Sequence, residues 1–392
     1  MGRLRITGVE LREVTYEVRD VGPDPRVAYL PVYRPGLVAE RRVPVFRIFT
    51  DGGVTGEYAG GSTLEAAGAR TVAGLLLGQD PLERERIYDD AKRALRQHAR
   101  MGIGPLDIAL WDLAGKRYGA PVFELLGGFR RELPCYASTF TGDHEGGLDS
   151  PEAYADFARR CRELGYPGFK IHPVAEGDVA LDCATVLAVR AAVGDRMALM
   201  LDPACAYNTF GEAVLVGRAC DEARFFWYED PFKDGGISQF AHKKLRQLIR
   251  TPLLQAEHVR TLEPHVDFIV AEATDFVRGD PHYDGGITGV MKIAHAAEGF
   301  GLDCELHGAG PAQRHLMAAM RNSNFYELGL VHPRTGSGHA PVYADGYRDD
   351  LDSVDGTGCV AVPEGPGLGV TYDWDYIRAH TAERLTLGAV PD

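Results

Sequence analysis

From residue 130 onward the chain repeats one pattern: a short apolar run, a polar or charged residue at its end, and a segment with helical spacing. Short apolar runs bounded by polar positions predict strands, and strands that alternate with helices predict parallel βα units. Eight runs over roughly 200 residues favour closure of the sheet into a barrel. The runs are 132–138, 168–172, 197–202, 225–229, 253–257, 276–280, 303–307 and 325–331.

An open doubly wound sheet is the competing interpretation of this pattern. Such a sheet normally carries a glycine-rich phosphate loop after an early strand. Neither GxGxxG nor GxxxxGK[ST] occurs in that position here. We therefore expect an α/β barrel with its chemistry at the carboxyl ends of the strands.

The first 128 residues follow a different pattern, which predicts a small α+β unit. The apolar runs 6–18 and 43–49 are typical of strands, and the turn 50–53 (Thr-Asp-Gly-Gly) after the second is typical of a hairpin. The segment 21–37 is rich in proline, tyrosine and arginine, so we expect neither regular helix nor a central strand there.

Helical spacing extends from about residue 64 to residue 119, with a break near 102–105. Apolar residues recur at helical intervals in its second half, which predicts a buried stripe. The stripe consists of Leu106, Ala109, Leu110 and Leu113.

Composition narrows the function classes. The 392 residues carry 42 Lys and Arg against 56 Asp and Glu, a net charge of -14 that argues against nucleic-acid binding. No run has the length of a membrane span, and the start lacks the apolar core of a signal peptide, so we expect a cytoplasmic protein without membrane partners. The seven cysteines are scattered without a CxxC, which predicts reduced thiols and neither a disulfide framework nor a zinc site.

Three of the predicted strands end in carboxylates: Asp202, Glu229 and Glu257, spaced 27 and 28 residues apart. Successive barrel strands would place them side by side at one mouth, where three anions repel unless a cation lies between them. Oxygen ligands favour a hard ion, Mg²⁺ first and Mn²⁺ second. The competing interpretation is three separate solvated acids at loop starts.

Candidate bases flank these carboxylates on both sides. Lys170 and His172 alternate on one strand and therefore face the same side. Asp280 and His307 end two successive strands, where a carboxylate beside an imidazole fixes its tautomer and raises its pKa. Glu327, at the last strand, is placed to offer a proton or hydrogen bond to a substrate carboxylate.

This set of groups suits removal of a proton beside a carboxylate. A metal would hold the carboxylate and stabilise the enediolate, while a side-chain base takes the α-proton. Reprotonation on the other face gives a racemase or epimerase, loss of a β-hydroxyl gives a dehydratase, and expulsion or capture of an internal oxygen gives a cycloisomerase.

Two segments resemble the signature of the enolase superfamily's capping domain: Gly102-Ile-Gly-Pro-Leu-Asp-Ile-Ala-Leu-Trp-Asp-Leu-Ala-Gly-Lys116 and Pro121-Val-Phe-Glu-Leu-Leu-Gly-Gly128. The barrel residues resemble those of its mandelate racemase subgroup. The resemblance covers nearly the whole chain. It implies a (β/α)7β TIM-like barrel over 129–359 with an α+β capping domain over 1–128, completed by about 360–392.

By this resemblance Asp202, Glu229 and Glu257 are the Mg²⁺ ligands. Asp280 and His307 match the family's Asp/His dyad, with Asp284 as the second choice for the carboxylate. Lys170 and Glu327 match the family's Lys and its acid near the last strand.

The chain departs from the family at one position, because many relatives carry Lys-x-Lys where it has Lys170-Ile171-His172. His172 then replaces the second Lys as base or proton donor, or only orients the substrate. A two-base racemase with His172 facing His307 is the alternative to a dehydratase in which His307 is base, acid or both.

The resemblance also places a specificity segment at 21–37, folded over the barrel mouth. Within it Tyr29 and Arg34 are the leading candidates for substrate contacts, and Arg26 and Tyr33 are further ones. A role at a subunit interface is the competing interpretation of these side chains. His258 is expected either to contact a substrate hydroxyl or to cap a loop.

Three functions follow from these expectations. The first is a Mg²⁺-dependent lyase that converts a sugar acid, mono- or diacid, to a 2-keto-3-deoxy acid and water. The second is a racemase, epimerase or lactone cycloisomerase on a similar acid. The third is a catalytically silent binding or structural protein, which would have lost ligands or bases that this chain retains. The family implies a homo-oligomer, a dimer or an octamer.

Overall fold

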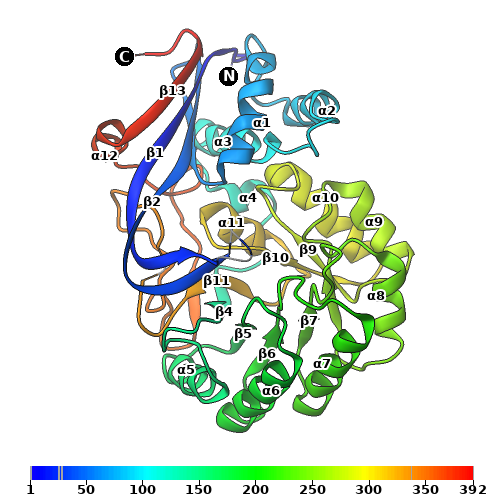
Figure 1. Cartoon of the computed structure of the whole chain (residues 1–392). Helices are drawn as coiled ribbons and strands as arrows, with labels where there is room; N and C mark the ends of the chain where they lie inside the picture. The colour runs from blue at the N-terminus through cyan, green and yellow to red at the C-terminus, as the bar shows by residue number, and fades with distance from the viewer. Residues whose placement is uncertain (1, 25–26, 28–29, 337, 392) are drawn as a thin grey trace.

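A computed structural model of the chain describes residues 2–24, 27, 30–336 and 338–391 (Figure 1). It is a mixed α/β fold around a curled parallel sheet, in which the strands are hydrogen-bonded in the order β11-β4-β5-β6-β7-β8-β9-β10. The terminal strands β10 and β11 also contact each other. The strands are β4 (Glu132–Thr141), β5 (Gly168–His172), β6 (Ala198–Leu201), β7 (Trp227–Glu229), β8 (Leu253–Gln255), β9 (Phe276–Gly279), β10 (Asp303–Leu306) and β11 (Tyr326–Val331).

One helix connects each of these strands to the next, and in Figure 1 the helices α5 to α9 lie along the outside of the sheet. All eight apolar runs expected from the sequence are strands, and the strand–helix alternation is confirmed. The connecting helices are α5 (Pro151–Glu163), α6 (Val179–Val193), α7 (Phe210–Ala223), α8 (Gln239–Arg246), α9 (Leu262–Val270), α10 (Gly286–Gly299) and α11 (Pro311–Ala319).

Several of these helices begin at a side-chain cap, which defines where each loop ends. The Ser150 side chain accepts a hydrogen bond from the Ala153 amide at the start of α5, and Asp178 caps α6. Thr209 and Glu212 form a reciprocal capping box at α7. These caps fix the point at which each loop after a strand passes into its helix.

The N-terminal part is an antiparallel sheet packed on helices. Its elements are β1 (Ile6–Pro23), β2 (Pro31–Thr50), β3 (Thr55–Ala59), α1 (Thr63–Val72), the 3₁₀ helix η1 (Ala73–Leu76), α2 (Arg84–Ala94), α3 (Ile103–Tyr118) and α4 (Val122–Leu125). The expected hairpin at residues 50–53 joins β2 to β3. The expected stripe on α3 is buried, although the predicted helix from 64 to 119 is also interrupted between α1 and α2.

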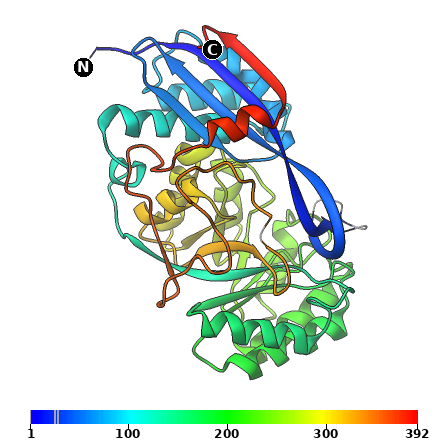
Figure 2. The ribbon, with the colours of Figure 1, turned by 90° about the vertical axis from the view of Figure 1, so that its left-hand side faces the viewer.

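The C-terminal segment returns to the N-terminal sheet. It contains β12 (Cys359–Ala361), which pairs with β4, then α12 (Trp374–Ala379) and β13 (Thr381–Gly388). Strand β13 pairs antiparallel with β1, so both termini lie at the same end of the molecule (Figure 2).

The segment 21–37, expected to be neither regular helix nor a central strand, contains no helix in its described residues, and much of it forms the end of a strand hairpin. Residues 21–23 belong to β1 and residues 31–37 to β2, and the two strands form a long hairpin whose far end pairs Val32 with Thr141 of β4. The prolines Pro23 and Pro31 stand at the strand ends, where a missing amide hydrogen is tolerated. The hairpin therefore reaches from the N-terminal sheet to the mouth of the parallel sheet.

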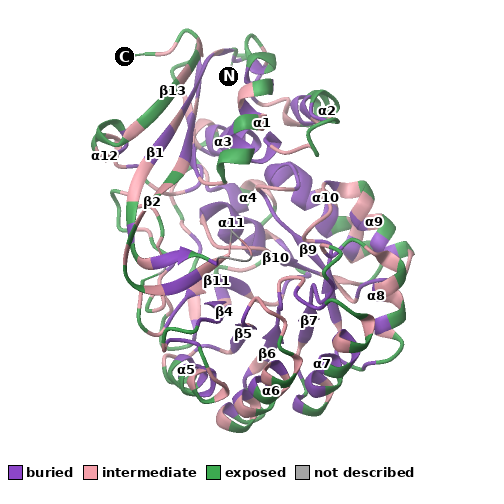
Figure 3. Ribbon diagram, viewed as in Figure 1, coloured by how far each residue is buried: buried purple, intermediate pink, exposed green. Residues whose placement is uncertain are grey.

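Burial follows the two layers (Figure 3). The strands of the parallel sheet and the inner faces of α3 and α10 are buried, whereas the outer faces of the surrounding helices are exposed. None of the helices in the described part of the chain is both long and apolar enough to span a membrane.

Candidate active site

A cavity of about 500 Å³ opens between the carboxyl ends of the parallel strands and the β1–β2 hairpin. The strand ends contribute most of the ionisable groups predicted from the sequence, and the hairpin contributes an opposing wall. From the strand ends and the loops after them the cavity is lined by His172, Asp202, Glu257, His258, His307 and Glu327. From the hairpin it is lined by Tyr16, Leu30, Pro31, Arg41 and Val43.

Three carboxylates converge at the bottom of this cavity. Oxygen atoms of Asp202, Glu229 and Glu257 lie within 4.8 Å of one another, as the strand spacing predicted. Asp202 follows β6, Glu229 ends β7, and Glu257 lies two residues after β8, so three neighbouring strands present them. We call these residues the carboxylate triad.

Glu229 is the most buried member of the triad, with a fully buried side chain. Burial raises the pKa of Glu229 to about 8, and the carboxylates of Asp202 and Glu257 add to that rise. The Arg278 guanidinium opposes it through hydrogen bonds from Nε to Oε1 and from Nη2 to Oε2, both 2.6 Å. Glu229 is thus the member of the triad whose ionised form is disfavoured, and a cation between the three carboxylates would favour it.

Lys170 lies behind the triad and does not line the cavity. Its Nζ is 2.8 Å from Glu327 Oε1, 3.3 Å from Glu229 Oε2 and 3.5 Å from Asp202 Oδ2. Burial acts to raise the pKa of Glu327, but Lys170 and Arg278 hold that pKa well below its usual range. Glu327 is therefore an anion that accepts hydrogen bonds from Ser138 Oγ and the Gly308 amide, both at 2.7 Å.

His172 faces the cavity from the end of β5. Its Nδ1 donates to the carbonyl of Thr139 at 2.7 Å, so that Nε2 points to Asp202 Oδ2 at 3.0 Å. The expectation that Lys170 and His172 share one side of the strand is confirmed, since both contact Asp202.

His307 and Asp280 form a pair on the other side of the triad. The Nδ1–H of His307 donates to Asp280 Oδ2 at 2.5 Å, and Nε2 lies 3.5 Å from Glu257 Oε1. Burial lowers the pKa of His307, but the carboxylates of Glu257 and Asp280 outweigh it and raise the pKa to about 9. The ring stacks on Tyr283 with 5.8 Å between centroids, which fixes its orientation.

Asp284, the second choice for the carboxylate partner of His307, binds backbone amides instead. Its carboxylate accepts hydrogen bonds from the amides of Thr261 and Asp280, both at 2.9 Å, and it does not line the cavity. It holds the loop after β9 in place, and with it the Asp280 side chain.

The expected substrate contacts have different positions. Tyr29 and Arg26 lie outside the described residues. Arg34 is half-buried on β2 but is absent from the cavity wall, and Tyr33 stacks on His332 with 4.7 Å between ring centroids. His258 does line the cavity, and its Nε2 is 3.2 Å from Asp230 Oδ2.

Sequence reasoning missed several groups that the structure brings to the site, among them Arg278 and Tyr58. Arg278 sits within the apolar run of β9, and its charge in that run was the available signal. Tyr58 on β3 reaches the cavity from the N-terminal sheet, where its hydroxyl is 2.5 Å from His282 Nε2. Nothing in the sequence around Tyr58 relates that strand to the parallel sheet.

The triad fits a divalent cation. Three clustered carboxylate oxygens are hard ligands of the kind Mg²⁺ and Mn²⁺ prefer. Burial raises the pKa of Glu229, the neighbouring carboxylates add to that rise, and a cation at the triad would favour the ionised form. With His307 and His172 on opposite sides of the triad, the site is equipped to hold an acid and move a proton beside it.

Two family models match the chain. The N-terminal domain model of mandelate racemase and muconate lactonizing enzyme matches residues 28–127, and the enolase C-terminal domain-like model matches residues 153–376. The second match alone spans more than half of the chain.

Individual relatives agree with the models. The L-talarate/galactarate dehydratase of Salmonella typhimurium is 33% identical over 267 residues, which cover 67% of this chain and 65% of that protein. The D-galactarolactone cycloisomerase of Agrobacterium fabrum is 31% identical over 82% of this chain and 85% of its own length. The crystal structure of D-glucarate dehydratase from Agrobacterium tumefaciens complexed with magnesium superposes with a TM-score of 0.87 at 30% identity, covering 97% of this chain and all of that one.

Proposed function

The chain belongs to the enolase superfamily, in its mandelate racemase subgroup, and we propose that it is a Mg²⁺-dependent dehydratase of a sugar acid, an aldonate or an aldarate. The observation that carries the proposal is one cavity lined both by Asp202 and Glu257 of the carboxylate triad and by His307, which Asp280 holds from behind. Dehydratases of galactarate and glucarate among the relatives support the choice of reaction.

Mg²⁺ held by Asp202, Glu229 and Glu257 would supply positive charge to the substrate carboxylate and to the enediolate that forms from it. Asp280 holds Nδ1–H of His307, so Nε2 of the neutral ring is the atom that takes the α-proton. Positive charge at the triad would offset the Glu257 carboxylate, which helps to raise the pKa of His307 to about 9, and would thereby favour the neutral ring. The C–O bond to the β-hydroxyl then breaks, and a proton from His307 or His172 lets that oxygen leave as water. The enol product tautomerises to the 2-keto-3-deoxy acid.

Lys170 and Glu327 complete the proposed site without touching the reacting carbon. Lys170 balances the charge of the buried carboxylates and keeps Glu327 ionised. Glu327 lines the cavity and fixes the Gly308 amide, which follows His307 directly. We expect both to orient the base and to tune the charge around it.

Isomerisation is the second candidate function. The match to a galactarolactone cycloisomerase over 82% of the chain favours it, as does the placement of two imidazoles, His172 and His307, on one cavity. Deuterium entering recovered substrate from D₂O without loss of water would identify a racemase or epimerase, and ring opening without a keto acid would identify a cycloisomerase.

We also propose the complete architecture that goes with this function. The contact between β10 and β11 supports a closed (β/α)7β barrel over 129–359. The pairing of β13 with β1 supports a capping domain made of 1–128 and about 360–392. The working form is proposed to be a dimer or octamer, which light scattering on the purified protein would test.

The first experiment is a screen of the purified protein with Mg²⁺ against mono- and diacid sugars. It detects 2-keto acid with a carbonyl reagent and includes an EDTA control. A metal-dependent hit supports a dehydratase and identifies its substrate. Product that forms equally in EDTA would contradict the role of the metal, and a plate without keto acid would favour isomerisation.

A further inference from the structure

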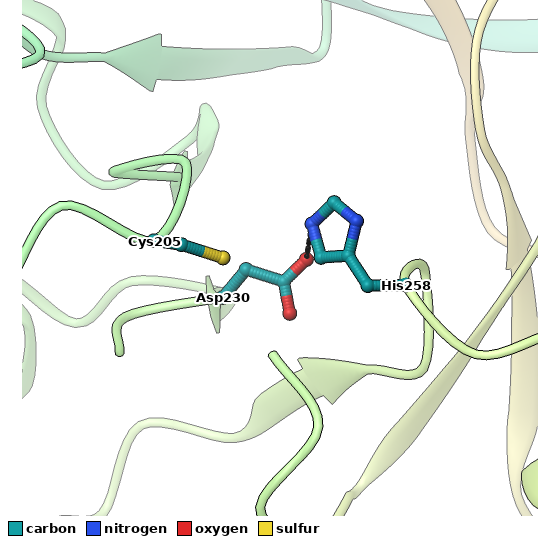
Figure 4. A group of neighbouring side chains, drawn as sticks. All are labelled: Cys205, Asp230 and His258. Carbon is teal, nitrogen blue, oxygen red and sulfur yellow. Dashed lines mark ion pairs between the residues drawn. The ribbon is translucent and has the colours of Figure 1, made fainter. Parts of the chain in front are cut away.

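A second group of metal-binding side chains lies beside the carboxylate triad. Cys205, Asp230 and His258 point toward one another from three separate loops (Figure 4). Cys205 Sγ, an Asp230 carboxylate oxygen and a His258 ring nitrogen all lie within 4.8 Å of one another. His258 Nε2 and Asp230 Oδ2 are 3.2 Å apart, the separation of two ligands on one small cation.

The backbone beneath this cluster is tied together across strands. The Cys205 amide donates to the Asp230 carbonyl at 2.7 Å, and the Tyr207 amide donates to the Pro231 carbonyl at 3.0 Å. Both Cys205 and Asp230 have left-handed backbone angles, with φ of 63° and 35°. These bonds hold the two side chains at fixed positions, so the cluster does not need to assemble when a ligand arrives.

One polar atom of the cluster has no partner. Asp230 is 1% exposed, and its Oδ1 is buried without a hydrogen bond to any described residue. Gly236 packs directly against it, since a side-chain Cβ there would lie 2.7 Å from Oδ1 and 2.9 Å from the His258 ring. A buried carboxylate oxygen without a donor costs free energy unless a cation or water meets it.

We propose that Cys205, Asp230 and His258 form a binding site for a thiophilic divalent cation, Zn²⁺ in the first place. A thiolate, an imidazole and a carboxylate are the donor set of zinc, whereas Mg²⁺ takes oxygen ligands, so this site and the carboxylate triad select different ions. Coordination replaces the thiol proton of Cys205 and any proton on His258 Nε2, and both protons go to solvent.

The site has three protein ligands and faces the substrate cavity. Asp230 and His258 both line that cavity, so the fourth position of a tetrahedral ion would open toward it. A bound ion there would take His258 away from substrate and add positive charge near the triad. We therefore expect micromolar Zn²⁺ to inhibit the Mg²⁺-supported reaction, a consequence that rests on the proposed function.

The absence of a zinc motif in the sequence does not conflict with this site. Its ligands follow three different strands, β6, β7 and β8, and the expectation against zinc considered only cysteines close together in the chain. A barrel brings such strand ends together without any short spacing between them.

Co²⁺ titration of the Mg²⁺-loaded protein tests the site without any assay of turnover. A cobalt–thiolate bond gives a near-ultraviolet charge-transfer band that carboxylate ligation does not, so the band reports the cysteine. We expect one equivalent of Co²⁺ to produce it and Zn²⁺ to abolish it. Cys205→Ser should remove the band and weaken Zn²⁺ binding in calorimetry by at least about tenfold, and His258→Gln should weaken it similarly.

Cys183→Ser is the matched control, because Cys183 is also partly exposed but lies on α6 away from the cluster. This variant should keep the band at full intensity. The proposal is overturned if wild-type protein shows no band, or if the band persists in Cys205→Ser. Because these outcomes are read from the metal alone, they stand even when no sugar acid proves to be a substrate.

Discussion

The imidazole of His307 stands beside the carboxylate triad without belonging to it, with Nδ1 held by Asp280 and Nε2 facing the cavity. His307→Asn retains a hydrogen-bonding side chain but removes the base. We expect kcat to fall by at least about 10²-fold, the typical contribution of a general base, while Mg²⁺ affinity stays nearly unchanged. Steady-state turnover and Mg²⁺ calorimetry measure the two quantities separately.

His295→Asn provides the control for that variant, since His295 is an exposed histidine on α10. It should leave both turnover and metal binding as in the wild type. Turnover by His307→Asn at a near-normal rate would remove His307 from the mechanism and leave His172 as the base.

Glu257 is the most accessible member of the carboxylate triad, with a side chain 13% exposed. His307 Nε2 lies 3.5 Å from its carboxylate, and Arg278 Nε lies 3.9 Å from it. Glu257→Gln should therefore remove a metal ligand without breaking a close buried ion pair. We expect Mg²⁺ affinity and kcat/KM to fall together, each by at least about tenfold. The same change at the exposed Glu222 of α7 should affect neither, and wild-type Mg²⁺ affinity in Glu257→Gln would place the metal elsewhere.

The sequence predicted the carboxylate triad because the carboxyl ends of all the parallel strands of a barrel lie at the same mouth. A carboxylate at the end of an apolar run must face the mouth, whichever neighbours it has. Arg278 was missed for the opposite reason, since it lies inside the run of β9: its charge there was a signal, but the sequence did not show that its partner is Glu229. The partner of a buried charged residue lies on another strand, and a single sequence does not show which strand supplies it.

His315 on α11 joins three segments that are far apart in the chain. Its Nδ1 accepts the Phe123 amide of α4 at 3.2 Å, and its Nε2–H donates to the Leu368 carbonyl at 3.0 Å. Both bonds require the neutral ring, because a proton on Nδ1 would face the Phe123 N–H. Burial lowers the pKa of His315 to about 4, with the Arg314 charge acting in the same direction.

This low pKa predicts a loss of stability in mild acid. His315 titrates near 6.5 in the unfolded chain, so the unfolded chain binds more protons than the folded chain between pH 6.5 and pH 4. The contribution of the neutral His315 ring to folding stability is therefore present above pH 6.5 and is lost as the pH falls. The variant His315→Gln lacks this titrating ring. We therefore expect the unfolding free energy of the wild type, measured relative to that of His315→Gln, to fall by about 2 kcal/mol from pH 7 to pH 5. Denaturant titrations at the two pH values measure this, and a pH-independent difference would contradict it.

Periodicity located the strands of the parallel sheet well and the β1–β2 hairpin poorly. Apolar runs such as Ala198–Leu201 are buried on both faces, so their composition alone marks them as strands. The far end of the hairpin is exposed on much of its length and carries proline, and its strand conformation depends on pairing with β1 and β4. Such pairing leaves little trace in the local sequence.

The substrate cavity belongs to neither sheet alone. The parallel sheet supplies the ionisable groups at its carboxyl ends, and the hairpin from the N-terminal sheet covers them with Tyr16, Arg41 and Val43. The two walls of the cavity therefore come from parts of the chain that the sequence alone did not bring together. The sequence predicted substrate contacts from Tyr29 and Arg34, but among the residues that the structure describes, Arg41 is the arginine that lines the cavity.

If Arg41 binds the far end of a sugar acid, its removal should affect binding more than chemistry. It lies on β2 across the cavity from the triad, close enough to oppose the burial that raises the pKa of Tyr16. We expect Arg41→Gln to raise KM about tenfold for a diacid substrate, the loss of one charge-assisted hydrogen bond, with kcat within about twofold. Arg42→Gln is the matched control, because Arg42 is its exposed neighbour and pairs with Glu13 and Glu383 instead. Equal effects of the two variants, or a fall in kcat alone, would show that Arg41 does not hold the substrate.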